Sequence, residues 1–198
     1  MGIVIMVVIL TLNLAGLNNN MKPWEMVWNV MSGKGETPPL AQTPSNPADN
    51  DYYARLAKAE SGGNVEAKAT TSSAVGPFQF VEKTWLEQTK AMGKDYALEA
   101  RTDYAKAKEV VQHFTEKNRE YLQNKLGREV GDTDLYAAHF LGNQGASKLL
   151  TAKPFMTVDK VVDKRALTAN KNVFYDKVTK KPRTVAEVYK ILQNKIGE

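Results

Sequence analysis

The sequence predicts a mainly α-helical domain that follows an apolar N-terminal helix and a proline-rich linker. Three observations predict it. An apolar run without charge precedes Lys22, four prolines fall within residues 32–50, and helical spacing with helix start and stop signals recurs through residues 51–198. No sustained strand-like alternation is present, although residues 62–80 leave room for a small β-hairpin.

Residues 1–31 are predicted to form an apolar helix. The fifteen residues from Ile3 to Leu17 are almost all apolar, and at helical rise they span about 22 Å, short of the ~30 Å hydrocarbon core of a bilayer. Trp24 and Trp28 follow at helical spacing, which suits a membrane interface or a partner helix. A membrane-inserting helix, a helix packed in an assembly and a signal peptide all remain open. The absence of an early basic residue and of a small-x-small cleavage site argues against the signal peptide.

Residues 32–50 are predicted to be a linker. They combine four prolines with two glycines and many small polar residues. Such a composition favours an extended, semi-rigid spacer. The linker would therefore hold the following domain away from whatever residues 1–31 contact.

The first helices of residues 51–198 are read from apolar faces and capping signals. Tyr53, Leu56 and Ala57 give a first helix its apolar face, and this helix ends at Glu60. Residues 84–87 have capping-box spacing and predict the start of a second helix at Thr84. A long amphipathic helix runs from Tyr104 to Leu122 and is closed by Gly127.

The C-terminal half supplies three further helices. Thr133 opens a segment, residues 135–141, that is apolar nearly all round, which predicts a helix at the centre of the domain. Thr157 is predicted to cap a short helix through Val162. Residues 184–187 form a second capping box, which opens a last helix through Ile196.

Composition excludes some kinds of site. The chain has no cysteine, which excludes disulfides and thiolate metal sites, and with only two histidines no metal centre is expected. The net charge is +5, and because residues 1–50 carry −1, residues 51–198 carry +6. A basic domain suits an anionic polymer such as peptidoglycan, nucleic acid or acidic lipid. No basic-aromatic recognition module is present, so nucleic acid is not an expected partner.

One carboxylate stands where a helix is predicted to end and a glycine-bearing turn begins. Glu60-Ser61 precedes Gly62, and residues 73–80 read Ser-Ala-Val-Gly-Pro-Phe-Gln-Phe. Cleavage of a glycosidic bond needs an acid that protonates the leaving oxygen. Aromatic surroundings that exclude water disfavour the ionised form of such an acid. The candidates for this apolar wall are Tyr53, Phe78, Phe80 and Phe140.

These residues resemble the motif of the soluble, lysozyme-like lytic transglycosylases, which cut the glycan strands of bacterial peptidoglycan. Members carry Glu-Ser, then a stretch ending Ala-x-Gly-x-x-Gln, then a central hydrophobic helix. The chain has Glu60-Ser61, then residues 74–79 as Ala-Val-Gly-Pro-Phe-Gln, then residues 136–142. The resemblance covers residues 51–198 and implies a lysozyme-like helical domain there.

The resemblance also implies roles for individual residues. Glu60 would act first as acid and then as base, and the N-acetyl oxygen of the substrate would replace a second carboxylate, so that a 1,6-anhydro ring forms. Gln79 would hydrogen-bond the sugar near the cut bond, and Phe80 would bind the substrate. Ser73 would orient the N-acetyl group, with Thr70 as an alternative by spacing. No cofactor or metal is needed.

The chain departs from the family in ways that resemble a phage-borne branch. In the central helix, residues 138–142 read Ala-His-Phe-Leu-Gly, where many members have Ala-Tyr-Asn-Ala-Gly. His139 therefore either reaches the substrate cleft or is a core histidine. Tyr189 is the nearest match to a C-terminal tyrosine that lines the family's cleft, or it packs a helix. Gly76 would let the backbone approach the glycan.

Two other functions stay open at this stage. A hydrolytic lysozyme of the same fold would use Glu60 with a second carboxylate, drawn from Asp103, Asp132, Asp134 or Glu82. The alternative outside the enzymes is a structural protein of a virion or an envelope conduit that carries a catalytically inactive muralidase domain.

The expected location follows from the N-terminal segment and the resemblance. Without a recognisable signal peptide, delivery in a phage particle is favoured over export. The enzyme would then act in the host envelope during genome entry, with other virion proteins and the membrane as further partners. A membrane-anchored periplasmic enzyme is the alternative.

Overall fold

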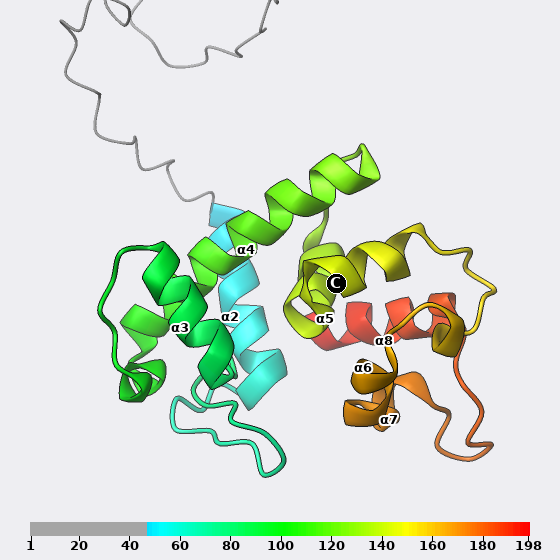
Figure 1. Cartoon of the computed structure of the whole chain (residues 1–198), viewed down its shortest axis with the longest axis horizontal. Helices are drawn as coiled ribbons and strands as arrows, with labels where there is room; N and C mark the ends of the chain where they lie inside the picture. Colours follow the sequence, from blue (N-terminus) through cyan, green and yellow to red (C-terminus); the bar gives the residue numbers. More distant parts are fainter. Residues whose placement is uncertain (1–46) are drawn as a thin grey trace, which may run out of the picture. The chain divides into compact units, whose positions relative to one another are not determined.

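The structure is a computed structural model that describes residues 47–198, with side chains from Tyr52 onward. The apolar helix predicted for residues 1–31 and most of the predicted linker lie outside the described residues. The described elements are α2 (Pro47–Ser61), α3 (Glu82–Ala91), α4 (Tyr104–Leu126), α5 (Asp132–Thr151), α6 (Lys164–Ala169), α7 (Lys171–Phe174), α8 (Val185–Ile196) and the 3₁₀ helices η1 (Leu98–Thr102) and η2 (Val158–Lys160) (Figure 1). None of the helices described is long and apolar enough to cross a bilayer.

Helix α5 is the centre of the described domain, as its sequence predicts. Residues 133–138 are six consecutive buried residues, and Leu135 and Tyr136 are at most 1% exposed. Helices α4 and α8 pack on it from different sides (Figure 1). Each large apolar side chain buried in this way contributes about 1.5–3 kcal/mol through removal from water, so α5 organises the packing of its neighbours.

Helices with strong local signals begin and end close to where the sequence places them. Gly127 ends α4 in the left-handed conformation. The capping box of α8 is formed as predicted, with the Thr184 hydroxyl accepting from the Glu187 N–H and the Glu187 carboxylate accepting from the Thr184 N–H. The Thr184 N–H lowers the pKa of the Glu187 carboxyl by stabilising its charge.

Three predicted boundaries are wrong. Helix α2 begins at Pro47, inside the predicted linker, because proline fits the first turn of a helix. Helix α3 begins at Glu82 rather than Thr84, since the Ser73 hydroxyl, distant in sequence, accepts from the Glu82 N–H at 3.2 Å. The segment after Thr157 is the short 3₁₀ turn η2 rather than a helix through Val162.

The loop of residues 62–81, between α2 and α3, holds isolated antiparallel bridges where the sequence leaves room for a small hairpin. Val75 pairs with both Lys68 and Phe80. A buried arginine in η1 fixes this loop: Arg101 Nη1 donates to the carbonyl oxygens of Ser73 at 2.7 Å and Phe80 at 3.1 Å. The loop is therefore held by a distant side chain rather than by strand pairing.

Candidate active site

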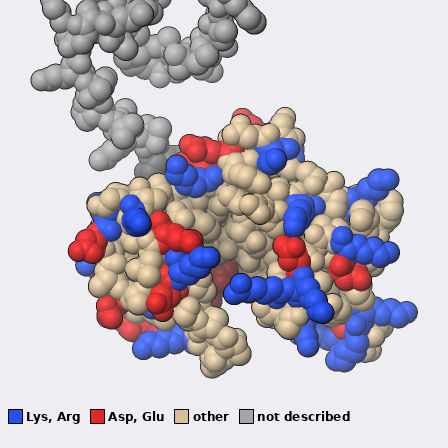
Figure 2. All heavy atoms as spheres, viewed as in Figure 1, with Lys and Arg blue, Asp and Glu red and all other residues tan. Residues whose placement is uncertain are grey.

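A cleft of about 440 Å³ opens at the C-terminal end of α2. It is bordered by α2, α3 and the loop of residues 62–81 and, across from them, by α5 and the α6–α7 junction (Figure 1). The space-filling view shows the face hollowed between these halves (Figure 2). Its lining residues are Glu60, Ala69, Ser72, Ala74, Gln79, Phe80, Val81, Thr84, Phe114, His139, Phe140, Gly142 and Asn170.

Glu60 lies in the last turn of α2 and is half-buried. The helix stops directly after it, because Gly62 and Gly63 turn back and donate to the carbonyl oxygens of Lys58 and Ala57. Among the residues that line the cleft, Glu60 is the one charged side chain. The local sequence thus delivers a single carboxylate to a cleft with otherwise neutral walls.

Two buried tyrosine hydroxyls lie within electrostatic reach of Glu60. Burial, followed by the charge of Glu60, raises the pKa of Tyr136, while burial and the nearby groups Tyr53, Asp132 and Glu60 raise the pKa of Tyr52. A side-chain hydrogen bond to Glu60 also raises the pKa of Tyr136, although this contact lies outside the geometry of a regular hydrogen bond. The Tyr52 hydroxyl has no hydrogen-bond partner among the described residues. Both remain protonated over the whole neutral range, so each can only present a donor or a neutral dipole toward the carboxylate.

Gln79 is held in the cleft by its own loop. Its side-chain amide donates to the carbonyl oxygens of Gly76 at 2.9 Å and Ala67 at 3.2 Å. Because both partners are acceptors, the NH₂ group is committed to the loop, and the amide oxygen is the atom left to accept from a ligand. The backbone of Gln79 has φ of 50°, a strained value for a residue other than glycine.

His139 both lines the cleft and is bound to the core. Its Nε2 lies 3.1 Å from the carbonyl oxygen of Phe78, which can only accept, so Nε2 carries a proton. In the neutral ring, Nδ1 is then a buried acceptor, and it has no partner among the described residues. The imidazole also packs edge-on against Phe80 and Phe114. The two interpretations of His139 are thus compatible.

The apolar wall of the cleft differs in part from the predicted one. Phe80 and Phe140 line the cleft as expected, joined by Phe114. Phe78 and Tyr53 do not line it, because both are buried in the core, where Phe78 packs on Tyr104 with ring centroids 5.7 Å apart. Three phenylalanine rings therefore provide the surface against which sugar faces could pack.

Gly142 interrupts α5 where the helix borders the cleft. Its φ of 71° and ψ of 161° are not helical, and the helix resumes with residue 143. A residue with a Cβ would be strained in this conformation. The break ends the buried first half of α5 beside His139 and Phe140 and keeps the backbone of Gly142 in the cleft wall.

Two residues predicted to bind substrate do not line this cleft. The Ser73 hydroxyl serves the start of α3, as described above, and the neighbouring Ser72 lines the cleft instead. Thr70, the alternative to Ser73, is exposed and is also outside the lining. Tyr189 lines a different hollow and donates to the Asp134 carboxylate at 3.3 Å, which supports the helix-packing interpretation.

Gly76 has a different role from the one predicted. It lies at φ of 88°, and a Cβ placed on it would come within 2.0 Å of the Arg101 carbonyl oxygen. The close approach is thus to the backbone of η1 and not to a ligand. The sequence does not indicate that Thr84 and Asn170 line the cleft or that Arg101 holds its loop, since nothing in their local sequence signals which distant segment they meet.

None of the four carboxylates considered as a second catalytic group lines the cleft. Asp132 pairs with Arg55, and Asp134 pairs with Arg128 at 2.6 Å. Asp103 caps α4 through the N–H groups of residues 105 and 106. Glu82 is exposed in the first turn of α3. All four thus have positions outside the Glu60 cleft.

Comparison with known proteins gives a short match to transglycosylases. A segment of 36 residues is 47% identical to a protein described as probable transglycosylase SceD in two strains of Staphylococcus aureus, bovine RF122 / ET3-1 and MRSA252. The match covers 18% of this chain and 16% of the length of these relatives. No family model matches the chain.

Proposed function

We propose that the chain is a peptidoglycan lytic transglycosylase with a lysozyme-like domain, and that it cleaves the β-1,4 bond between N-acetylmuramic acid and N-acetylglucosamine. The observation that carries the proposal is the single carboxylate, Glu60, in a cleft that also holds Gln79, Phe80 and His139. The short match to probable transglycosylases supports the same activity.

The proposed reaction uses one acid/base group. The protonated Glu60 carboxyl donates to the leaving glucosamine O4 while the N-acetyl oxygen of muramic acid attacks C1, so that the C1–O4 bond breaks. The Glu60 carboxylate then removes the proton of the C6 hydroxyl. O6 attacks C1 and displaces the N-acetyl oxygen, which closes the 1,6-anhydro ring and leaves Glu60 protonated. No water is added, and no metal or cofactor enters.

The surroundings of Glu60 favour this route over a hydrolase with two carboxylates. A retaining glycosidase places its two carboxyl groups about 5–5.5 Å apart, and an inverting one about 6.5–9.5 Å apart. In the described residues, no second carboxylate lines the cleft. The oxygen of Gln79 and the rings of Phe80 and Phe140 can instead orient a sugar that supplies its own nucleophile.

The test is the chemical nature of the new ends. We expect the full chain to release muropeptides with 1,6-anhydromuramic ends from purified peptidoglycan, measured by mass spectrometry. Reducing ends, 18 Da heavier by the added water, would make the enzyme a hydrolase and would contradict the transglycosylase mechanism. No release by folded protein would remove the proposed activity and favour the structural virion function.

Removing the Tyr136 hydroxyl is expected to slow cleavage without unfolding the protein. Tyr136→Phe keeps the buried ring and removes only the weak contact of the hydroxyl with Glu60, so the free energy of unfolding should change by less than about 1 kcal/mol. If the hydroxyl steadies Glu60, kcat should fall about ten-fold, the value of one hydrogen bond. Urea unfolding and turnover on peptidoglycan measure the two effects.

The dependence of stability on alkaline pH separates a role of the Tyr136 hydroxyl in catalysis from a role in stability. Because the pKa of buried Tyr136 is raised in the folded protein, the unfolded chain ionises first and stability falls as pH rises above about 10. Tyr136→Phe should reduce that loss while leaving stability near pH 7 unchanged. An unchanged kcat in Tyr136→Phe would contradict a positioning role for this hydroxyl.

We also propose that the enzyme is carried by a phage particle and acts in the envelope of its host. The support is the apolar segment before Lys22, the proline-rich residues 32–50 and the sequence departures at residues 138–142. The membrane and other virion proteins are proposed partners of residues 1–31. Detection of the protein in purified phage particles is the measurement that decides this location.

A further inference from the structure

The excess positive charge of the described domain is confined to one short segment. Residues 160–183 carry eight Lys and Arg against two Asp, a net charge of +6. Residues 51–159 carry 15 basic and 15 acidic residues, and residues 184–198 carry two of each. The space-filling view shows the consequence: blue side chains gather over α6, α7 and the following loop, whereas red and blue are mixed over the α2–α4 half (Figure 2).

Most of these cations are not used by the fold. Arg183 is structural, because its guanidinium donates to the carbonyl oxygens of Asn172 and Val173 and lies 3.9 Å from Asp176. The other acid, Asp163, pairs with Lys148 outside the segment. Seven exposed cations remain without an ion pair to a described residue, and we call them the basic surface: Lys160, Lys164, Arg165, Lys171, Lys177, Lys180 and Lys181.

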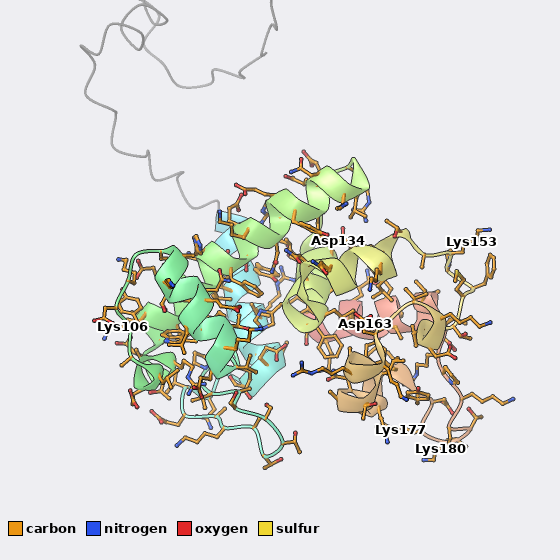
Figure 3. All side chains as sticks on the ribbon, in the orientation of Figure 1. Lys106, Asp134, Lys153, Asp163, Lys177 and Lys180 are labelled. Atoms are coloured by element: carbon orange, nitrogen blue, oxygen red, sulfur yellow. The ribbon has the colours of Figure 1, made fainter. Side chains whose placement is uncertain are left out.

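The basic surface contains a hollow of about 520 Å³. Lys171, Lys177 and Lys180 line it together with Asn172, Tyr175 and Asp176. Lys177 and Lys180 lie on the loop after α7 and point away from the body of the domain (Figure 3). The loop is shaped by the Asp176 carboxylate, which accepts from the N–H groups of Val178 and Thr179. The Lys180 ammonium also donates to the carbonyl oxygen of Lys177 at 2.7 Å. Three lysines therefore line a hollow held by an ordered turn.

The hollow continues the wall of the Glu60 cleft. Asn170 lines the cleft and the next residue, Lys171, lines the hollow. The rings of Phe140, in the cleft wall, and Phe174, at the end of α7, pack with centroids 5.9 Å apart. A ligand that occupies the cleft and extends past Asn170 thus meets the basic surface.

We propose that the basic surface binds the carboxylates of the stem peptides of peptidoglycan, next to the site where the glycan is cut. This inference rests on the proposed function. The sugars of the strand are uncharged, which suits a cleft lined by neutral side chains apart from Glu60. The carboxylates sit on peptides that branch from muramic acid, so a strand in the cleft directs negative charge outward to its rim.

The binding experiment uses two ligands that differ only in charge. Soluble uncrosslinked strands are first acetylated on the amines of their stem peptides. The preparation is then divided in two, and in one portion the stem carboxylates are converted to methylamides. Binding is measured with the full chain carrying Glu60→Gln, so that no strand is cut. We expect the carboxylate strands to bind about ten-fold more tightly at low salt, as three exposed ion pairs supply. The difference should disappear near 0.5 M salt.

Charge-matched variants locate the effect. Lys171→Gln, Lys177→Gln and Lys180→Gln together should abolish the preference for carboxylate strands while leaving methylamide binding unchanged. The control triple variant Lys90→Gln, Lys117→Gln and Lys125→Gln removes three exposed lysines from α3 and α4 and should keep the preference. Circular dichroism tests whether both triple variants remain folded. We expect that they do, because all six lysines lie on the surface.

Each outcome decides between the two claims. Equal binding of both ligands, or no binding of either, overturns the stem-peptide inference. The inference is also overturned if the preference for carboxylate strands survives the first triple variant. It is likewise overturned if the preference is seen only with strands that carry a covalently attached phosphodiester polymer. Charge-dependent binding together with failure of the wild-type chain to cleave peptidoglycan would instead overturn the proposed function and leave the basic surface as a peptide-binding site.

Discussion

Glu60→Gln is expected to lower the rate of peptidoglycan cleavage by about 10²–10⁴-fold, the contribution of a positioned general acid/base. Gln keeps the size of the side chain and its capacity to hydrogen-bond, but it has no proton to donate to O4 and no carboxylate to take one from the C6 hydroxyl. Both proposed half-reactions are therefore blocked. Single-turnover release of muropeptides, measured against the wild type, gives the ratio.

Stability should be preserved in this variant. Glu60 is half-buried at the end of α2 and makes no ion pair to a described residue, so the free energy of unfolding should change by less than about 1 kcal/mol. Glu82→Gln and Asp103→Asn are matched controls, since both remove a carboxylate outside the cleft and the Asn retains capping at α4. They should keep nearly full activity.

The outcome that contradicts the assignment is specific. A folded Glu60→Gln enzyme with more than a tenth of wild-type activity would remove Glu60 as the acid/base. If Asp103→Asn or Glu82→Gln then proved inactive, the second-carboxylate mechanism would regain support. The pattern of losses across the three variants thus distinguishes one catalytic carboxylate from two.

Gly76→Ala is expected to destabilise the domain by more than about 3 kcal/mol. The backbone at φ of 88° alone costs an L-residue about 1–2 kcal/mol, and the added Cβ would meet the Arg101 carbonyl oxygen at 2.0 Å. That oxygen belongs to the backbone of η1, so relief requires the loop and η1 to separate. Urea unfolding, with the slope held common to both proteins, measures the loss.

Activity should fall with this variant even at temperatures where it is folded. The loop supplies the Gly76 carbonyl oxygen that holds the Gln79 amide at 2.9 Å, and η1 supplies the Arg101 side chain that holds Ser73 and Phe80. Moving Gly76 from η1 therefore displaces two cleft residues, Gln79 and Phe80. A displacement of about 1 Å in a substrate-positioning group can cost on the order of 100-fold in rate.

Gly93→Ala is the matched control. Gly93 also has a positive φ, of 66°, but a Cβ there would meet nothing within 4 Å. Its cost should be limited to the backbone term of about 1–2 kcal/mol, with no change in activity. Equal destabilisation by the two substitutions would show that the contact with Arg101 does not matter.

The helices most accurately predicted are those whose ends are coded locally. The hydroxyl of Thr184 and the carboxylate of Glu187 are within one turn of each other, so the start of α8 follows from the sequence. Gly127 ends α4 for a similar reason. The start of α3 could not be found in this way, since Ser73, nine residues before Glu82, provides the acceptor.

The residues of the candidate site also differ in whether local sequence or long-range contacts determine their positions. The motif singled out Glu60, Gln79, Phe80 and His139, and the structure brings all four into one cleft. Ser73 and Tyr189 carry side chains suited to the same purpose, but their positions depend on contacts with α3 and with Asp134. A sequence motif identifies residue types that suit the chemistry. Long-range packing determines which of those residues face the cleft.

By itself, the sequence determined a mainly helical domain, a buried central helix and one carboxylate followed by a glycine turn, because helix periodicity, capping and turn formation act over a few residues. The tertiary structure alone decided that Gly76 packs on Arg101, that no second carboxylate among the described residues lines the cleft, and that Asn170 connects the cleft to the basic surface. These features join segments far apart in the chain, so they exist only once the packing around α5 has brought those segments together.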